Sequence, residues 1–467
     1  MTAAALSDTR TDAVSPTAEL AAFAAQLRYA DLPADVIEKA KVCFRDALAC
    51  CLFGVTQPWT VMLIDQAIEE GGHPRAGVIG SRLRTSIGQA VCIGATAGHG
   101  FELDDIHGAA HLHAGSLAVP VALALAELAP ASAGRNVIEA MVAGYEVGLR
   151  VGLAATGALF MRGHHFQATC GVFVAVATAV NMLRLPDDQA RHAFGIAGSL
   201  AEGLMSAQEG AMVKRLHAGH AAQMGVTGAM LASRGFTGIP DILEAPYGGF
   251  LSTLSGAPDY SWLTRGLGSA WEIRKVGFKP YATAASIHSP LGLLDALMSE
   301  NELSAGEIER LVVHCSAMAH RHCAWPYRPA GVTAAQMNMP FALAMMAVDR
   351  AAMGAQFRED RLADPKVLAM LDRIVVEPAE EYSKGGDETR HAARILLVTR
   401  SGRTFARETW NRPGSPANPM SETQLEQKFV ALAQSVLSAA QIDALDAAIG
   451  RLDALAVSAL RPLLTPQ

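Results

Sequence analysis

The chain has 467 residues, of which 51% are hydrophobic and 18% are charged, and its formal net charge is −7. This apolar content excludes a wholly disordered chain, because disorder requires low hydrophobicity and high charge. The mild acidity argues against a nucleic-acid-binding protein, whose footprint is a clustered basic surface. It remains compatible with an anionic substrate, since a few local cations can dominate a cleft.

Helix signals dominate the first 255 residues. Ser15-Pro16 predicts a helix start, with a capping serine followed by proline in the first turn. Apolar residues at spacings of three and four follow Pro33 and predict a helix that ends near Gly54. Further apolar helices are expected at about 87–100, 116–129, 135–156, 166–184, 188–206 and 217–234.

Three glycines of the segment 135–156 lie four residues apart. A ladder such as Gly144, Gly148 and Gly152 lets two helices approach closely, in a membrane or in a soluble core. Because Glu146 and Arg150 lie in the same segment, we favour a tight helix crossing in a soluble core.

No segment is suited to a membrane or to secretion. The longest uncharged apolar stretches, 116–125 and 170–183, fall short of the roughly 20 residues that a bilayer requires. The first twenty residues contain no apolar signal core. The seven cysteines form no C-x-x-C pair and lie mostly in apolar sequence, as free buried thiols do. We therefore expect a cytoplasmic protein with no membrane partner.

The sequence changes character near residue 256. Short β-prone runs occur at 271–277, 311–316 and 374–377, and two more, 395–399 and 404–408, flank Ser401-Gly402 as a predicted hairpin. Helices are expected between them at about 283–300 and 333–348. Helix signals then return, with a capping-box pattern at Ser421 and Gln424 and an amphipathic stretch at 442–455.

This order of elements predicts a mainly α protein. We expect a large all-α helical domain from residues 1–265 and 410–467, with a smaller α+β lid domain, residues 266–409, inserted between the two parts.

The common cofactor motifs are absent from the sequence. Gly266-Leu267-Gly268 lacks the third glycine of a dinucleotide fingerprint, and there is neither a phosphate-binding loop nor a complete G-x-S-x-G. One cluster has the donor types of a divalent-metal site: Glu102, Asp104, Asp105, His107, His111 and His113. Because no H-E-x-x-H motif or cysteine ligand accompanies it, we favour proton chemistry and expect neither a metal nor a cofactor.

Five segments place glycine, histidine, lysine and acids within otherwise apolar sequence: 100–107, 111–115, 163–169, 214–219 and 277–281. Buried charges are costly unless they are paired or used, and clusters with mutually shifted pKa values mark acid–base sites. In this order the segments resemble the MmgE/PrpD family, which contains 2-methylcitrate dehydratases, cis-aconitate decarboxylases and iminodisuccinate epimerase. The resemblance covers nearly the whole chain. It implies a helical large domain, an α+β lid, a cofactor-independent site in the cleft between them, and a homodimer.

The resemblance also implies individual site residues. Five residues match the family's H-P-G, G-[FW]-H, K-x-L-H-x-G and F-K-x-[YF] segments and its acidic pair. They are the predicted catalytic residues: His113, His165, Lys214, Lys279 and Asp104. The predicted substrate-binding residues are Glu102, Asp105, His107, Arg215 and Tyr281.

Three positions depart from the family pattern. Ala114 replaces the proline of H-P-G, Glu102 stands where decarboxylases have aspartate, and Ile106 stands where threonine is usual. The last change removes a hydroxyl that would face the substrate. It argues against a decarboxylase and weakens the case for a dehydratase.

The chemistry of these residue types is consistent with proton transfer next to a carboxylate. Such a transfer passes through a dianionic enediolate and requires a base and concentrated positive charge. Lys214, Arg215 and Lys279 supply that charge, while histidines exchange protons near neutral pH. Structural interpretations stay open: a backbone-bonded histidine for His113 or His165, a solvated helix end for Lys214, a surface loop for Lys279 and a cap for Asp104. His217, His220, His320 and His322 are expected to be ordinary surface or core histidines, and Tyr327 is a weak candidate from the lid.

We predict an enzyme that moves a proton at a carbon next to a carboxylate of a small di- or tricarboxylate. Within this class we favour an isomerase that epimerises an iminodisuccinate-like amino diacid, with a histidine (His113 or His165) and a lysine (Lys279 or Lys214) on opposite faces of the carbon. Dehydration of a 2-methylcitrate-like hydroxy acid by a hydro-lyase is the second hypothesis. A non-catalytic carboxylate-binding protein of the same fold is the third.

Overall fold

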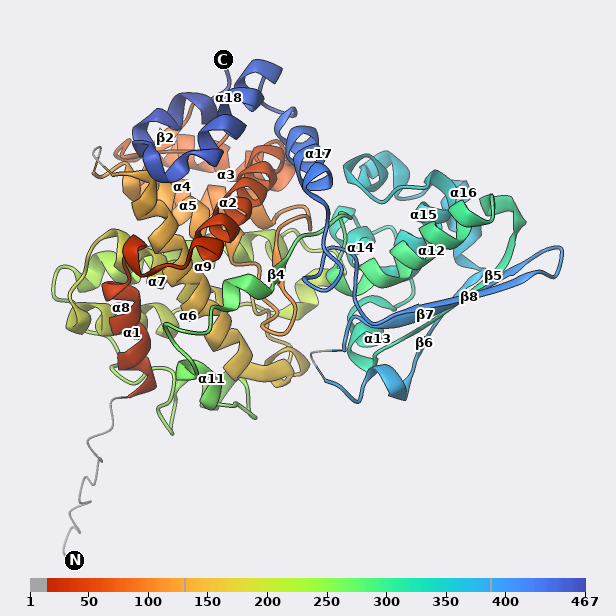
Figure 1. Cartoon of the computed structure of the whole chain (residues 1–467), viewed down its shortest axis with the longest axis horizontal. Coiled ribbons are helices and arrows are strands. Elements are labelled where there is room, and N and C mark those ends of the chain that lie inside the picture. The colour runs from red at the N-terminus through yellow and green to blue at the C-terminus, as the bar shows by residue number, and fades with distance from the viewer. Residues whose placement is uncertain (1–14, 130–131, 387–388) are drawn as a thin grey trace, which may run out of the picture.

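The computed structural model describes residues 15–129, 132–386 and 389–467. The prediction that the first twenty residues contain no secretory signal concerns mostly residues 1–14, which lie outside the described residues. The protein is mostly helical with one four-stranded sheet, and the sheet lies to one side of a large helical body (Figure 1). The helices of the body before the sheet are α1 (Pro16–Gln26), α2 (Ala34–Gly54), α3 (Pro58–Glu70), α4 (Ile87–His99), α5 (Gly115–Ala126), α6 (Gly134–Met161, with a break at Thr156), α7 (Gly171–Met182), α8 (Asp187–Ser199), α9 (Val213–Ala232), α10 (Phe250–Leu254) and α11 (Ser261–Thr264).

Several predicted helix boundaries are confirmed. The Ser15 hydroxyl accepts a hydrogen bond from the Ala18 amide, and α2 ends at Gly54. Two predicted helices are shorter than expected, because α7 begins only at Gly171 and α8 ends at Ser199. The segment before α7 bonds to the segment after α8: the His165 amide donates to the Gly203 carbonyl at 2.9 Å. These tertiary hydrogen bonds follow the end of α8, whereas the residues just before α7 form a turn with local bonds, in which the Gly171 amide donates to the Phe166 carbonyl at 3.0 Å.

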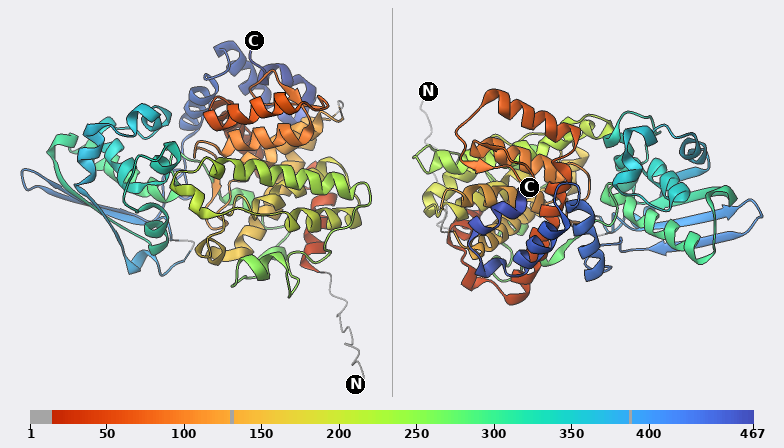
Figure 2. Two further views of the ribbon diagram at one scale, coloured as in Figure 1. Left: turned by 180° about the vertical axis from the view of Figure 1, so that it is seen from behind. Right: turned by 90° about the horizontal axis from the view of Figure 1, so that it is seen from above.

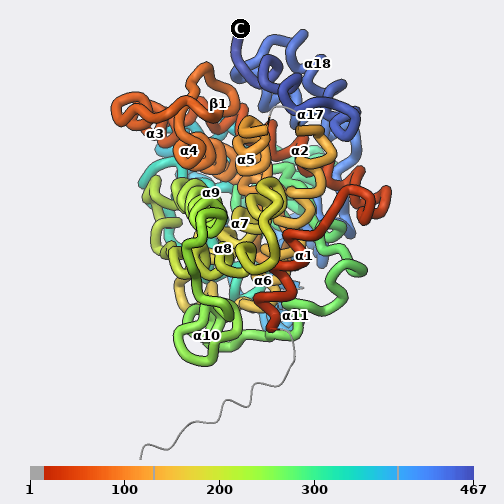
Figure 3. Tube along the Cα trace, turned by 90° about the vertical axis from the view of Figure 1, so that its left-hand side faces the viewer, coloured from red at the N-terminus to blue at the C-terminus, as the bar shows by residue number. Residues whose placement is uncertain are grey.

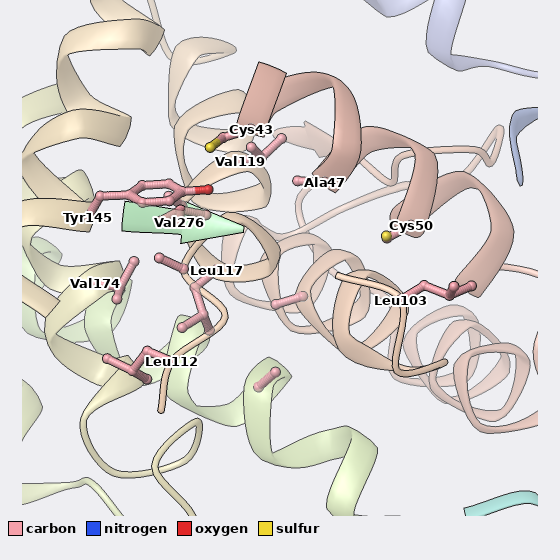
Figure 4. Close-up of a cluster of buried hydrophobic side chains, with 14 of the residues drawn as sticks. Cys43, Ala47, Cys50, Leu103, Leu112, Leu117, Val119, Tyr145, Val174 and Val276 are labelled. Atoms are coloured by element: carbon pink, nitrogen blue, oxygen red, sulfur yellow. The ribbon is translucent and has the colours of Figure 1, made fainter. Parts of the chain in front are cut away.

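Gly144 and Gly148 of the glycine ladder pack α6 tightly against α7, whereas Gly152 packs against Ala110 and Leu112. A Cβ atom added at Gly144 would lie 2.1 Å from Thr178 Oγ1 and 2.8 Å from the Val174 carbonyl oxygen, so only glycine fits the crossing. Close packing fills the helical body, whose buried cluster includes Tyr145 of α6 and Cys43 of α2 (Figure 4). All seven cysteines are free thiols, six of them buried.

Replacing Gly144 by Ala is expected to destabilise the protein by roughly 2 kcal/mol, because the added methyl group meets a backbone oxygen that cannot move aside. The matched control is Gly450→Ala near the chain end, where nothing lies within 4 Å of the new Cβ. That variant is expected to gain up to about 1 kcal/mol from helix propensity. Urea unfolding of both variants measures the difference, and equal midpoints would contradict the packing of α6 on α7.

The predicted strand at 271–277 is wrong in most of its length. Residues Glu272–Lys275 form a 3-10 turn, and only β4 (Val276–Gly277) is extended. The turn is held by the buried carboxylate of Glu146, which accepts hydrogen bonds from the amides of Glu272 and Ile273, both at 3.0 Å. Burial raises the pKa of Glu146 to about 7. This tertiary cap outweighs the β propensity of the segment.

The sheet has the strand order β6-β5-β7-β8, with β5 (Ile308–Cys315) parallel to β6 (Ile374–Pro378) and antiparallel to β7 (Ala393–Thr399). The predicted hairpin is confirmed: β7 pairs antiparallel with β8 (Thr404–Thr409), and Val398 lies opposite Thr404. The helices that accompany the sheet are α12 (His288–Glu300), α13 (Ala317–Cys323), α14 (Val332–Met337), α15 (Met339–Asp349) and α16 (Pro365–Leu371). The expected helix 333–348 is divided at Asn338, whose side chain caps α15.

The chain returns to the helical body after the sheet. α17 (Glu422–Ala433) begins at the predicted Ser421–Gln424 capping box and packs on α2, and α18 (Ala439–Gly450) follows (Figures 1 and 2). Lys428 of α17 reaches the Asp46 carboxylate and the Leu103 carbonyl, both at 2.6 Å. The domain boundaries at 265/266 and 409/410, the motion implied by a lid, and the homodimer stay predictions.

Seen from the side away from the sheet, the helices of the body lie closely side by side (Figure 3). Among the described residues, no single helix has both the length and the apolar character needed to cross a membrane. Only α2 and α3 together pass that test, and their axes are bent by 78°.

Candidate active site

The site is built on the loop between α4 and α5. Residues 102–107 of this loop are buried, although four of the six are charged or histidine. Its strand β3 (Ile106–His107) pairs with β4, with Ile106 opposite Gly277, and this pairing brings Lys279 beside the loop. Glu102 and His111 have left-handed backbone φ angles of 57° and 56°. Such angles are unfavourable for residues other than glycine and are concentrated at functional sites.

A cavity lies between this loop, α9, the segment that precedes the sheet, helices α13 and α14, and the segment between β6 and β7. The space within it that atoms do not fill is roughly 500 Å³, including the part that is open to solvent. Its wall combines charged groups and histidines with apolar side chains. The lining residues are Glu102, Ile106, His111, His113, Phe160, His165, Phe166, Met205, Lys214, Lys279, Ala284, Ala285, Ser286, His322, Met337, Arg390 and His391.

The centre of the site is a buried carboxylate held by three cations. Glu102 accepts hydrogen bonds from Lys214 and Arg215, both at 2.6 Å, and from Lys279 at 3.2 Å. Burial opposes ionisation of Glu102, but these cations outweigh it and hold its pKa well below the usual range. The pKa of Lys214 is lowered by burial and by Arg215 and Lys279, although Glu102 opposes the shift. The group carries more positive than negative charge and suits an anionic ligand.

A second group combines two imidazoles with a carboxylate. His113 Nδ1 lies 2.7 Å from the Asp105 carbonyl oxygen and 3.3 Å from Asp104 Oδ1, and His99 Nδ1 lies 2.8 Å from Asp104 Oδ2. Burial raises the pKa of Asp104, but His113 and His99 outweigh it and hold the pKa well below its usual range. Asp104 is therefore a permanent carboxylate that lies beside both imidazoles.

His165 belongs to a pair of histidines. Its Nδ1 lies 2.9 Å from Nδ1 of His217, so one ring donates and the other accepts. Burial and nearby Lys214 hold the pKa of His165 well below its usual value, and burial lowers that of His217 to about 4. Both rings are neutral at physiological pH.

The structure brings Glu102, His113, His165, Lys214 and Lys279 to the cavity wall, as the sequence predicts. Asp104 and Arg215 lie behind it and act on the wall through His113 and Glu102. The remaining predicted substrate-binding residues face other elements. Asp105 contacts the Tyr145 hydroxyl at 2.6 Å, His107 contacts Glu272 at 3.2 Å, and the Tyr281 ring packs edge-on against His288. None of these three side chains is among the residues that line the cavity.

Several residues in or beside the cavity wall were not predicted as site residues. His322, expected to be a surface or core histidine, lines the cavity, and His217 is a buried histidine that bonds to His165. Arg390 and His391 come from the segment before β7 and carry no motif in the sequence. His99 ends α4, where the apolar helix gave no sign of chemistry.

Three side chains have donor atoms close enough to share a metal ion: His99, Asp104 and His113, within 4.8 Å of one another. This set differs from the sequence cluster, since His107 bonds to Glu272 and His111 lies against Arg390. The contacts between the imidazoles and Asp104 are those of a hydrogen-bonded acid–base group.

A second cavity lies between α5 and the chain end, and its charged residues serve the fold. Glu127 accepts from the Gly77 amide at 2.9 Å, and Arg461 donates to the Val78 carbonyl at 2.9 Å. It contains neither histidine nor lysine among the described residues that line it.

Asp105 gives a pH-dependent contribution to stability. Burial and the neighbouring Asp46 raise its pKa to about 7, above the value of about 4 expected in the unfolded chain. The folded state therefore binds the extra proton, and the associated stability is lost as pH rises from about 4 through 7. Relative to Asp105→Asn, the wild type is expected to lose up to roughly 4 kcal/mol across this range. Urea unfolding at pH 4.5, 6 and 8 measures the loss, and a difference that does not change with pH would contradict it.

Comparison with known proteins shows the family to which the chain belongs. The MmgE/PrpD N-terminal domain matches residues 18–263, and the MmgE/PrpD C-terminal domain matches residues 281–452. The chain is 31% identical to a cis-aconitate decarboxylase of Aspergillus terreus, over 94% of this chain and 93% of the relative. It is 30% identical to a cis-aconitate decarboxylase-like protein of Aspergillus oryzae (96% and 97% covered) and 26% identical to the human cis-aconitate decarboxylase (75% and 73%). With both domain models matched in order and most of the chain covered, the protein is a member of the MmgE/PrpD family.

Proposed function

We propose that the protein is a lyase that decarboxylates cis-aconitate or a closely similar unsaturated tricarboxylate. The observation that carries the proposal is the buried Glu102 held by Lys214, Arg215 and Lys279, with His113 on the same cavity wall. The names of the relatives favour this reaction over epimerisation. Our preference for an isomerase gains no support from them.

The reaction requires one proton and a way to spread negative charge. The bond between the leaving carboxylate and its methylene carbon breaks, and its electron pair forms a new double bond. The pair of the old double bond takes a proton at the carbon next to another carboxylate, so that carbon dioxide and an unsaturated dicarboxylate result. Lys214 and Lys279 would bind this second carboxylate and stabilise the charge that develops on it.

His113 is the favoured proton donor. Its Nδ1–H donates to the Asp105 carbonyl, which leaves Nε2 to carry the proton that is transferred. Asp104, 3.3 Å from the ring, places a carboxylate beside the imidazole that would transfer the proton. His165 is a weaker candidate as the acid, since its low pKa keeps it neutral. It suits the role of a hydrogen-bonding group for the substrate.

One observation favours the epimerase as the second candidate. Ile106 lines the cavity at the position where family members usually have a hydroxyl, so this wall offers the substrate an apolar contact. A small amino diacid needs fewer polar contacts than a tricarboxylate or a hydroxy acid. In that case a histidine and a lysine, His113 and Lys279, would act on opposite faces of the carbon.

A substrate comparison tests the proposal. The full-length protein is incubated separately with cis-aconitate, 2-methylcitrate and iminodisuccinate, and carbon dioxide, loss of water and optical rotation are recorded. The proposal expects carbon dioxide from cis-aconitate as the fastest reaction. Turnover of iminodisuccinate without carbon dioxide release from cis-aconitate would replace it by the epimerase, and no turnover of all three would overturn both.

A further inference from the structure

Gln336 of α14 is a fully buried amide that lies outside the sequence motifs of the site. Its oxygen accepts a hydrogen bond from Arg215 Nη2 at 2.7 Å, and its nitrogen donates to the carbonyls of Phe101 and Ala282, both at 2.9 Å. Because arginine can only donate and a carbonyl can only accept, one orientation of the amide satisfies all three partners. Glutamine thus suits this position by its chemistry as well as by its size.

Each partner of this amide leads directly to the charged centre of the site. Arg215 divides its guanidinium between two acceptors, because Nη1 donates to Glu102 at 2.6 Å while Nη2 donates to the amide oxygen. Phe101 directly precedes Glu102 in the chain, and Ala282 follows Lys279 by three residues. A single side chain therefore holds one cation of the centre and the backbone beside two of its other charged groups.

The backbone at Glu102 requires such support. Its φ angle of 57° is left-handed, and a residue other than glycine keeps this conformation only where the surrounding structure holds it. The carbonyls on both sides of it are held by side chains from distant parts of the sequence. The Phe101 carbonyl accepts from Gln336, and the Leu103 carbonyl accepts from Lys428 at 2.6 Å. These two contacts fix the loop from which the carboxylate reaches its cations.

Gln336 joins the parts of the chain that match the two domain models. It lies within the segment matched by the C-terminal domain, whereas Arg215 and Phe101 lie within the segment matched by the N-terminal domain. The backbone makes a further contact at the cavity wall, where the Ala284 amide donates to the Gln336 carbonyl at 3.1 Å. The charged centre is therefore held in part by a residue of the C-terminal domain.

We propose that Gln336 is a positioning residue, which fixes the Glu102 centre so that the lysines of the cavity wall are held in place to bind a substrate carboxylate. Groups that bind a ligand must be kept within about 0.5 Å of their productive geometry by contacts behind them. The inference rests on the proposed function for the identity of the ligand as a polycarboxylate. It gives the C-terminal domain a role in a site whose predicted catalytic residues all precede residue 281.

The test compares Gln336→Met with Asn181→Leu, a matched substitution of another fully buried amide. The Asn181 oxygen accepts from Arg184 at 3.4 Å. Its nitrogen donates to the carbonyls of Ala24 and Leu27, at 2.7 and 3.0 Å, and it is not among the described residues that line the cavity. Each substitution removes the same kinds of hydrogen bond from a buried site, so both are expected to lower the urea midpoint.

Ligand binding separates the two variants. It is measured by calorimetry of the full-length protein with propane-1,2,3-tricarboxylate, a saturated analogue that cannot react. We expect Gln336→Met to bind it about 10- to 100-fold more weakly, the range found when groups that orient metal ligands are removed. Asn181→Leu is expected to bind it as tightly as the wild type. Wild-type affinity in Gln336→Met, an equal loss in both variants, or a wild type that does not bind the analogue would overturn the proposal.

If Gln336→Met does not fold, Gln336→Asn replaces it. Asparagine keeps the amide but is one methylene shorter, so it cannot reach all three partners at once, and binding about 10-fold weaker is expected. Unchanged affinity in that variant would contradict the role of Gln336. Because the analogue does not react, the proposed decarboxylation can fail while this test succeeds. A wild type that binds the tricarboxylate but releases no carbon dioxide from cis-aconitate would give that result.

Discussion

Replacing Lys214 by Met is expected to reduce kcat/KM on cis-aconitate by about 10³-fold, since removing one preorganised group that stabilises developing charge has effects of this size. Lys214 lines the cavity and lies 2.6 Å from Glu102, so the variant removes a cation from the centre of the site. Glu102 keeps Arg215 and Lys279, so the free energy of unfolding is expected to change little. Steady-state kinetics and thermal unfolding of the same preparation measure the two effects.

The control for this variant is Lys384→Met, which removes a lysine whose side chain is 71% exposed. It is expected to leave both turnover and unfolding unchanged. Unaltered kcat/KM in Lys214→Met would remove Lys214 from the site. Loss of activity together with a large drop in the unfolding temperature would show that the ion pair with Glu102 supports the fold instead.

Replacing His113 by Asn is expected to lower kcat by 10²- to 10⁴-fold, the range for loss of a general acid. The amide of asparagine can still donate to the Asp105 carbonyl that His113 contacts at 2.7 Å, but it cannot carry the transferred proton. Substrate binding is expected to change far less than kcat, because the cations are untouched. Single-turnover kinetics separate the two, and His73→Asn at an exposed position is the control.

If His113→Asn keeps more than about a third of the wild-type kcat, a group other than His113 donates the proton. In that case Lys279, which lies 3.8 Å from Asp104 Oδ1, is the next candidate.

Periodic apolar sequence predicted the helices well, because their faces are buried against one another. The starts at Ser15 and Ser421 were predictable from capping chemistry that acts within one turn. The strand predicted at 271–277 failed because a distant carboxylate, Glu146, caps a turn there. The helix predicted to continue to 206 ends at Ser199, and residues 203–205 beyond it bond to residues 163–165. Both errors come from long-range hydrogen bonds, which local patterns do not contain.

The charged wall of the cavity was predictable because charges in apolar sequence require a partner or a function. Glu102, Lys214 and Lys279 were found in this way, together with their family motifs. His107 was predicted to bind the substrate because it lies between site residues in the sequence, but its side chain contacts Glu272. Arg390 could not be found, since its segment approaches the cavity only through the fold of the sheet.

The central claim is that the cavity delivers one proton to a carbon next to a carboxylate. It is tested most directly by incubating the protein with cis-aconitate in heavy water and recording proton and deuterium NMR spectra of the product. We predict carbon dioxide and an unsaturated dicarboxylate with one deuterium in the methylene group next to a carboxylate, formed far more slowly by His113→Asn. A product without deuterium, deuterium only at the terminal alkene carbon, or an unchanged substrate would contradict it.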